Sequence, residues 1–111
     1  MKRKYRLRRN SDFQRIRQVG KSYASSLLVL AFLRNEFDHS RFGFVVSKRL
    51  GKAVQRNKIK RRMREAVRLK IPHIKPGFDV VIIARIPSRN ATFSDICRSI
   101  ERLLKTANLL L

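Results

Sequence analysis

Hydrophobic positions along the chain group into short runs that predict β-strands. The longest, residues 26–34 (SLLVLAFLR), is apolar at both odd and even positions, so we expect a central strand covered on at least one face. Residues 35–40 form a polar turn, after which residues 41–47 (RFGFVVS) return antiparallel to the central strand. Further strands are expected over residues 78–85 and, more briefly, over residues 21–24.

Two stretches before residue 72 place apolar residues at helical spacing. The first predicts a helix over residues 12–19, with Ser11 as its N-cap and Gly20 as its stop signal. The second predicts a helix over residues 53–70, which Pro72 terminates because the residue before a proline disfavours helical geometry.

The last helix is expected over residues 90–110, with Thr92 as its cap. Its apolar stripe consists of Ile96, Ile100, Leu103, Leu104 and Ala107. Helices that must cover a sheet with hairpin-paired strands indicate an α+β fold, a two-layer α/β sandwich. We expect a flexible basic arm over residues 1–10 and a single α+β domain over residues 11–111.

The net charge of the chain limits the classes of partner that we expect. The 111 residues contain 28 Lys and Arg against 7 Asp and Glu, a formal net charge of +21. Such a charge destabilises a compact monomer by self-repulsion, so we expect a polyanionic partner, a nucleic acid. The one cysteine, Cys97, excludes an internal disulfide and a cysteine-built zinc site. With no signal peptide or membrane-spanning run, we expect a cytoplasmic protein with no membrane partner.

The charge is concentrated in residues 48–70, which hold eleven basic residues and one acid, Glu65. At about 100° per residue, one side of this helix carries the apolar residues Ile59, Met63, Ala66 and Val67. The opposite side carries a polar stripe of Asn57, Arg61, Arg64 and Arg68, flanked by Lys58 and Lys60. Arginine can engage two phosphate oxygens, and an asparagine amide both donates and accepts. A merely solvated helix face would mix charges of both signs, which this stripe does not.

Other kinds of site are less well supported. Aromatic residues on strands can stack on single-stranded RNA, but in a small domain they more often form core. The candidates are Phe13, Tyr23, Phe32, Phe42, Phe44 and Phe78, of which we assign two at most to a nucleic-acid surface.

The seven acids are dispersed, and neither His39 nor His73 has an evident partner, so we expect no catalytic residue and no metal site in the protein.

At the basic helix the sequence resembles a known family. The motif consists of Ser47-Lys48-Arg49, Gly51, Ala53-Val54, Arg56-Asn57, Lys60-Arg61 and Arg64-Glu65. Upstream the resemblance extends to Asp12-Phe13-Gln14 and Gly20-Lys21-Ser22, and downstream to residues 79–85 and 103–105. Together these segments resemble the bacterial ribonuclease P protein component over nearly the whole chain.

The resemblance implies a fold of order α-β-β-β-α-β-α, ribosomal-protein-S5-domain-2-like, with a left-handed β-α-β crossover. It also implies a partner, the ribonuclease P catalytic RNA, which removes the 5′ leader from precursor tRNA with Mg²⁺ bound by the RNA. The protein would be a monomer in a 1:1 ribonucleoprotein. The catalytic-RNA-binding residues would be Lys48, Arg49, Lys52, Arg56, Asn57, Lys58, Lys60, Arg61, Arg64 and Arg68.

A cleft between the first helix and the sheet would take the single-stranded leader, with Phe13, Arg17, Val29 and Ala31 as its residues. Here the chain departs from the family pattern, which usually has an aromatic residue at the position of Arg17 and a tyrosine at that of Ala31.

The alternative function is that of a ribosomal or other structural RNA-binding protein without an enzymatic role. A DNA-binding regulator fits the charge but not the predicted strands.

Overall fold

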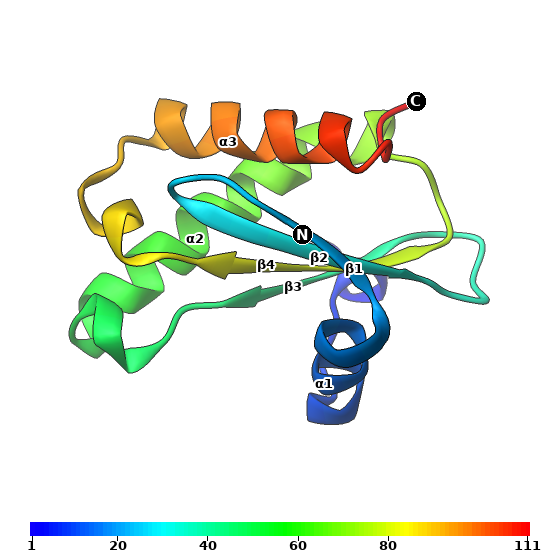
Figure 1. Ribbon diagram of the computed structural model, residues 1–111, viewed down its shortest axis with the longest axis horizontal. Coiled ribbons are helices and arrows are strands. Elements are labelled where there is room, and N and C mark those ends of the chain that lie inside the picture. The colour runs from blue at the N-terminus through cyan, green and yellow to red at the C-terminus, as the bar shows by residue number, and fades with distance from the viewer.

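The computed structural model describes all 111 residues and contains three α-helices, a four-stranded sheet and four short 3-10 turns (Figure 1). The helices are α1 (Asn10–Val19), α2 (Ala53–Lys70) and α3 (Phe93–Thr106), and the strands are β1 (Lys21–Ala24), β2 (Leu28–Arg34), β3 (Arg41–Val45) and β4 (Phe78–Ala84). The 3-10 turns are η1 (Arg3–Tyr5), η2 (Lys48–Leu50), η3 (Ile71–His73) and η4 (Ile86–Asn90). This order, α-β-β-β-α-β-α, confirms the mixed α+β fold.

The strand order in the sheet is β1-β2-β4-β3. β2 pairs antiparallel with both β1 and β4, whereas β3 pairs with β4 in parallel. The expectation that residues 41–47 pair with the central strand as a hairpin is therefore wrong, because β4 lies between β2 and β3. The physical reason is burial: β4 is apolar at nearly every position and takes a central place, which makes β3, α2 and β4 a parallel β-α-β unit.

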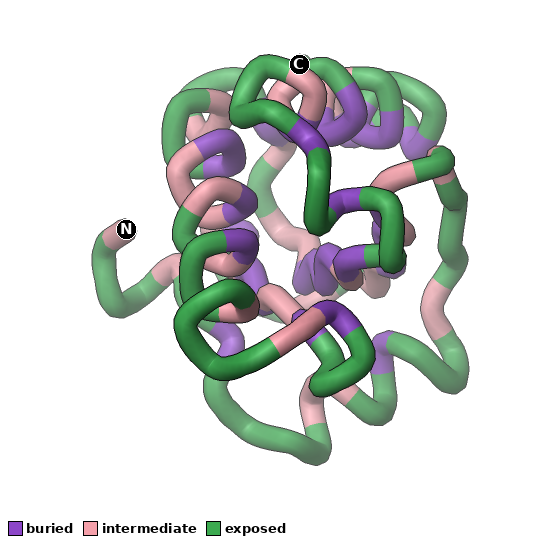
Figure 2. Tube along the Cα trace, turned by 90° about the vertical axis from the view of Figure 1, so that its left-hand side faces the viewer, coloured by how far each residue is buried: buried purple, intermediate pink, exposed green.

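The two faces of the sheet are covered unequally. α2 and α3 lie on one face and α1 lies on the other (Figure 1). A cluster of 20 buried residues fills the space beneath α2 and α3, whereas only Leu7, Ile16, Ala31 and Val81 form the buried cluster beneath α1. Buried positions accordingly lie on the inward sides of the helices (Figure 2). The sandwich of sheet with α2 and α3 is the two-layer core, to which α1 adds a smaller layer.

The two long helices behave as their sequences predict. Residues 53–70 form α2, and the four predicted core residues Ile59, Met63, Ala66 and Val67 are all buried. α3 begins where Thr92 accepts a hydrogen bond from the Asp95 backbone N–H and the Asp95 carboxylate accepts one from the Thr92 backbone N–H. These bonds hold the pKa of Asp95 below its ordinary value. None of the helices combines the length and apolar character needed to cross a bilayer.

Several element boundaries differ from expectation. α1 begins at Asn10, and the Asp12 backbone N–H donates to the carbonyl of Arg9, so Ser11 lies inside the first turn and is not the cap. α3 is shorter than residues 90–110, because the cap at Thr92 fixes its start and Asn108, at φ 58°, takes the chain out of helical geometry.

The N-terminal segment has a defined place on the sheet, where we expected a flexible arm. The Leu7 backbone N–H donates to the carbonyl of Phe42 at 2.9 Å, and the Leu7 side chain is buried beneath α1. Met1 and Tyr5 also pack against the large cluster, so several apolar residues hold this basic segment along the outer edge of β3.

Candidate nucleic-acid interface

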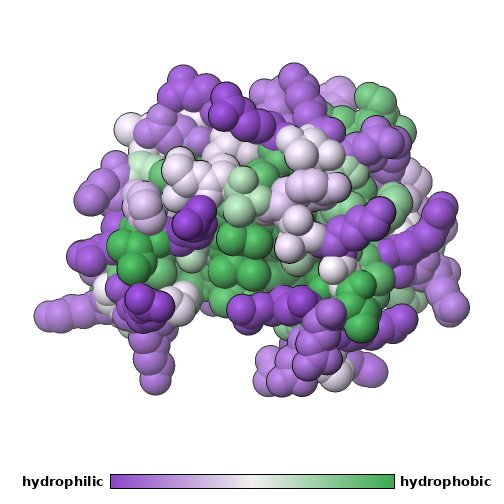
Figure 3. All heavy atoms as spheres, in the orientation of Figure 1, coloured by the Kyte–Doolittle hydropathy of each residue, from purple (hydrophilic) through white to green (hydrophobic).

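The side of α2 that faces away from the core presents the basic side chains that the helical periodicity predicts. We call it the outer face of α2, and it consists of Asn57, Lys58, Lys60, Arg61, Arg64 and Arg68. Asn57, Lys58, Arg61 and Arg68 are exposed, and Lys60 and Arg64 are half-buried. Because the opposite side of the same helix is anchored in the large cluster, these side chains have a rigid base. On the face that Figure 3 shows, hydrophilic side chains project at the edges, with apolar surface between them.

The charge on this face is less uniform than the sequence indicated. Glu65 accepts two hydrogen bonds from Arg68, at 2.9 Å from Nε and 2.6 Å from Nη2. The Arg68 guanidinium lowers the pKa of Glu65, and Glu65 in turn raises the pKa of Arg68. Arg68 is therefore already partnered within its own helix, whereas Arg61 and Arg64 make no side-chain hydrogen bond or ion pair within the protein.

Two further arginines of α2 are half-buried and differ in their contacts. Arg62 is half-buried and its Nη1 donates to the carbonyl of Ala91 at 3.0 Å, which ties α2 to the segment before α3. Arg56, one of the predicted RNA-binding residues, is half-buried, and its Nε is buried without a hydrogen-bond partner.

The loop before α2 adds its own basic residues. Lys48, Arg49 and Lys52 are exposed, while Leu50 is only 2% exposed and anchors η2 in the core. Gly51 has φ 127°, a conformation that residues with a side chain rarely adopt. The sequence predicts the basic residues of this loop. The structure adds that Leu50 anchors the loop and that the turn at Gly51 directs the basic side chains outward.

The predicted cleft beside α1 is defined by the sheet register. Ala31, Val81 and Gly43 form one row across the strands, and Val29, Ile83 and Val45 form the next row. The first row is buried, whereas all three residues of the second row are half-buried. Part of the apolar sheet surface on the α1 side therefore remains accessible along Val29.

Three of the four predicted cleft residues have accessible surface. Phe13 and Val29 are half-buried and Arg17 is exposed. Ala31 is only 3% exposed and belongs to the packed cluster beneath α1, so it offers almost no surface to a ligand. Its small side chain lies in the row that α1 covers, where the sequence alone gave no indication of the helix position.

Phe13 is held close to the sheet. Its ring lies so near Gly43 that a Cβ at that position would overlap it, and it packs against the cluster beneath α1. A lone glycine inside a strand pattern is a signal of such close approach, and Gly43 could have been recognised from it. Phe13 therefore has a packing role in addition to the leader contact that the resemblance implies.

The acidic residues are engaged in pairs rather than clusters. Arg41 donates to both oxygens of the buried Asp79, at 2.8 and 2.6 Å, and the pKa of Arg41 is raised by this bond. His39, which had no evident partner in the sequence, shares a 3.0 Å hydrogen bond with Asp38. No three His, Cys, Asp or Glu side chains lie close enough together to hold a metal ion.

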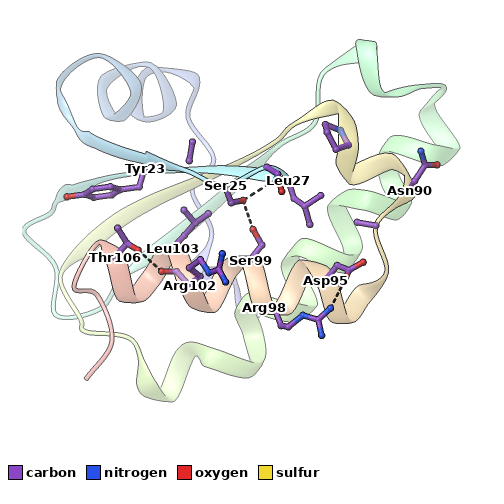
Figure 4. Close-up of a pocket in the computed structure, with 14 residues that line it drawn as sticks. Tyr23, Ser25, Leu27, Asn90, Asp95, Arg98, Ser99, Arg102, Leu103 and Thr106 are labelled. Carbon is purple, nitrogen blue, oxygen red and sulfur yellow. Dashed lines mark hydrogen bonds and ion pairs between the residues drawn. The ribbon is translucent and has the colours of Figure 1, made fainter.

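A hollow of about 810 Å³ lies elsewhere, between α3 and the β1–β2 turn (Figure 4). Ser25 and Ser99 share a 2.5 Å hydrogen bond there, and Arg98 donates to Asp95 at 2.6 Å. Of the aromatic candidates only Tyr23 lines this hollow, and none of the residues assigned to the catalytic RNA or to the leader does.

Comparison with known proteins adds an independent observation. The chain matches the protein family Ribonuclease P over residues 1–108. It is 47% identical over 104 residues to the ribonuclease P protein component of Clostridioides difficile, covering 93% of this chain and 91% of that protein. It is also 47% identical to the corresponding protein of Roseiflexus castenholzii, covering 96% of this chain and 88% of that one.

Solved structures agree with these sequence relatives. The ribonuclease P protein of Staphylococcus aureus superposes with a TM-score of 0.89 at 44% identity, covering 96% of this chain and 98% of that one. The Thermotoga maritima protein superposes with a TM-score of 0.84 at 38% identity, covering 91% of this chain and 96% of that one. A family match over almost the whole chain, an α+β fold shared with two relatives and a basic helix in the expected place lead to one conclusion: the chain belongs to the bacterial ribonuclease P protein family.

Proposed function

We propose that this chain is the protein subunit of a ribonuclease P ribonucleoprotein, and that the outer face of α2 and the η2 loop bind its catalytic RNA. Proteins of this family work with an RNA subunit as components of an endoribonuclease. The observation that carries the proposal is the exposed pair Arg61 and Lys58 with the neighbouring Arg64, on a helix whose other side is fixed in the core. Such a surface suits phosphates that repeat along an RNA strand.

The accessible surface beside α1 is the candidate site for the single-stranded 5′ leader of precursor tRNA. Val29 and its row offer accessible apolar surface, Arg17 offers an exposed guanidinium, and Phe13 offers a half-buried ring. A guanidinium can stack on a base and also attract a phosphate. Leader binding on this surface would favour the precursor over the mature tRNA, because only the precursor carries the leader.

The protein would assist the reaction without performing it. We assign the Mg²⁺ ions and the cleavage of the phosphodiester bond to the catalytic RNA. The part of the protein would be to place positive charge between two polyanions and to hold the leader. One copy of the protein on one catalytic RNA is the stoichiometry that we propose.

The test is reconstitution. The purified protein is added to ribonuclease P RNA at a low Mg²⁺ concentration, at which the RNA alone is nearly inactive, and release of the 5′ leader from precursor tRNA is followed. We expect restored cleavage at the mature 5′ end. Tight RNA binding without restored cleavage would favour a structural RNA-binding protein with no enzymatic partner, and absence of RNA binding would contradict the proposal.

A further inference from the structure

A second hollow lies beside the outer face of α2 and is strongly basic. It has a volume of about 410 Å³ and lies between the first half of α2 and the segment from η4 to the start of α3. Its charged lining residues are Lys58, Arg62 and Arg89, and no carboxylate lines it. Its polar lining residues include Gln55 and Asn90. We call it the η4 hollow.

The fold brings the three cations together from distant parts of the sequence. Lys58 and Arg62 are one turn apart on α2, and the bond from Arg62 to the carbonyl of Ala91 fixes the distance between α2 and the η4 segment. Arg89 comes from η4, next to Ser88, which is 1% exposed and donates to the carbonyl of Arg85 at 2.7 Å. The position of Arg89 is thus set by a buried neighbour.

Three like charges around one hollow repel one another, and within the protein none of them forms an ion pair. An external anion would relieve this repulsion. Two of the three groups are guanidinium forks, which match the geometry of phosphate oxygens. The amides of Gln55 and Asn90 could add neutral hydrogen bonds to a ribose or a non-bridging oxygen.

Lys58 belongs to both the η4 hollow and the outer face of α2, so the two surfaces are continuous. We propose that the η4 hollow holds a backbone phosphodiester of the RNA strand that α2 binds, with Arg89 as an RNA-binding residue from outside α2. This inference rests on the proposed function. RNA contacts from both α2 and η4 would fix how α2 is rotated about its own axis when it lies on the RNA. Contacts from the outer face of α2 alone would leave that rotation free.

The experiment is a double-mutant cycle on the full chain, with affinity for ribonuclease P RNA measured by filter binding. The variants are Lys58→Gln, Arg89→Gln and the double variant. If both side chains bind one phosphate, each single change weakens binding about 10- to 100-fold, as expected for a hydrogen bond to a charged group. The double variant should then lose clearly less than the product of the two single losses.

Two further variants keep the outcome interpretable. Arg98→Gln removes the same charge from an exposed position on α3 outside the η4 hollow, and we expect a change of no more than about 2-fold. Arg89→Lys keeps the charge but not the fork, and should recover part of the affinity. Multiplicative losses in the cycle, or an Arg89→Gln loss equal to that of Arg98→Gln, would overturn the inference.

Failure of the inference and failure of the proposed function give different results. The double variant Arg61→Ala/Arg64→Ala is measured in the same assay. If it weakens binding while Arg89→Gln behaves like Arg98→Gln, only the η4 hollow is refuted. If Arg61→Ala/Arg64→Ala leaves the affinity for RNA unchanged, α2 is not the RNA interface, and both proposals are refuted.

Discussion

The outer face of α2 and the accessible surface beside α1 lie on opposite sides of the same sheet, and they differ in whether the residues that would bind RNA also stabilise the fold. The charged residues of α2 stand outside a helix whose inward side packs into a cluster of 20 buried residues. The aromatic residue of α1, Phe13, is itself part of the packing over a cluster of only four. Changes on the outer face of α2 should therefore alter RNA binding alone, whereas changes beside α1 should alter both binding and folding.

The largest effect is expected on the α2 side from Asn57→Asp. The change keeps the size of an exposed side chain, removes its donors and places a negative charge beside RNA. We expect a loss of affinity for the catalytic RNA of about 100-fold, since juxtaposed like charges cost several kcal/mol. Filter binding measures the loss, and the melting temperature should not change. Asn108→Asp, the same change at an exposed position beyond α3, is the control, and an equal loss there would remove the special role of α2.

The strongest test on the α1 side is Gly43→Ala. The added methyl group would overlap the Phe13 ring, and overpacking of this kind costs about 1–3 kcal/mol. Thermal unfolding should show a melting temperature lower by about 4–8 °C per kcal/mol. The second change Phe13→Ala in the same protein should add less destabilisation than Phe13→Ala does alone. Simple additivity of the two changes would mean that Phe13 does not rest on Gly43 in solution.

A smaller and more specific effect is expected from Phe13→Leu. Leucine keeps most of the apolar packing but removes the flat ring, and stacking on one base contributes about 1–3 kcal/mol. Precursor tRNA should bind the holoenzyme more weakly with the affinity for mature tRNA unchanged, and the melting temperature should fall less than for Gly43→Ala, because leucine keeps most of the packing. If both tRNA affinities fall alike together with the melting temperature, Phe13 is a packing residue only, and the leader site rests on Arg17.

The smallest effect is expected from Glu65→Gln on α2, which should strengthen RNA binding where the other changes weaken it. It removes the one carboxylate of the helix and releases Arg68 from its ion pair. We expect binding to the catalytic RNA to strengthen about 2- to 3-fold, in keeping with the modest energy of exposed ion pairs. Glu101→Gln, which removes a carboxylate of α3 and frees Lys70 and Lys105, serves as the comparison. Unchanged or weaker binding by Glu65→Gln would show that Arg68 does not face RNA.

The sequence was informative wherever one periodic pattern determined the outcome. The bounds of α2 and its four core residues follow from helical spacing and Pro72 alone, and the cap of α3 follows from Thr92 and Asp95. The outer face of α2 could be predicted for the same reason, since a residue opposite a buried stripe must face solvent.

What the sequence could not supply depends on contacts between distant segments. The insertion of β4 between β2 and β3 cannot be distinguished from a hairpin by apolar alternation, because both arrangements bury the same residues. The burial of Ala31 depends on where α1 crosses the sheet, and the place of Arg89 beside Lys58 depends on the path of η4. The pairing of Glu65 with Arg68 was open to prediction from their i,i+3 spacing, but the count of basic residues obscured it.

The most direct test of the central account is the salt dependence of binding to the catalytic RNA for the wild-type chain and for Arg61→Ala/Arg64→Ala. If these two side chains contact phosphates, the slope of log affinity against log salt concentration should fall in magnitude by about one unit per lost contact at most. We predict a drop of about one to two units with an unchanged melting temperature. Equal slopes for the two proteins would show that the outer face of α2 is only a solvated surface, and would contradict the account.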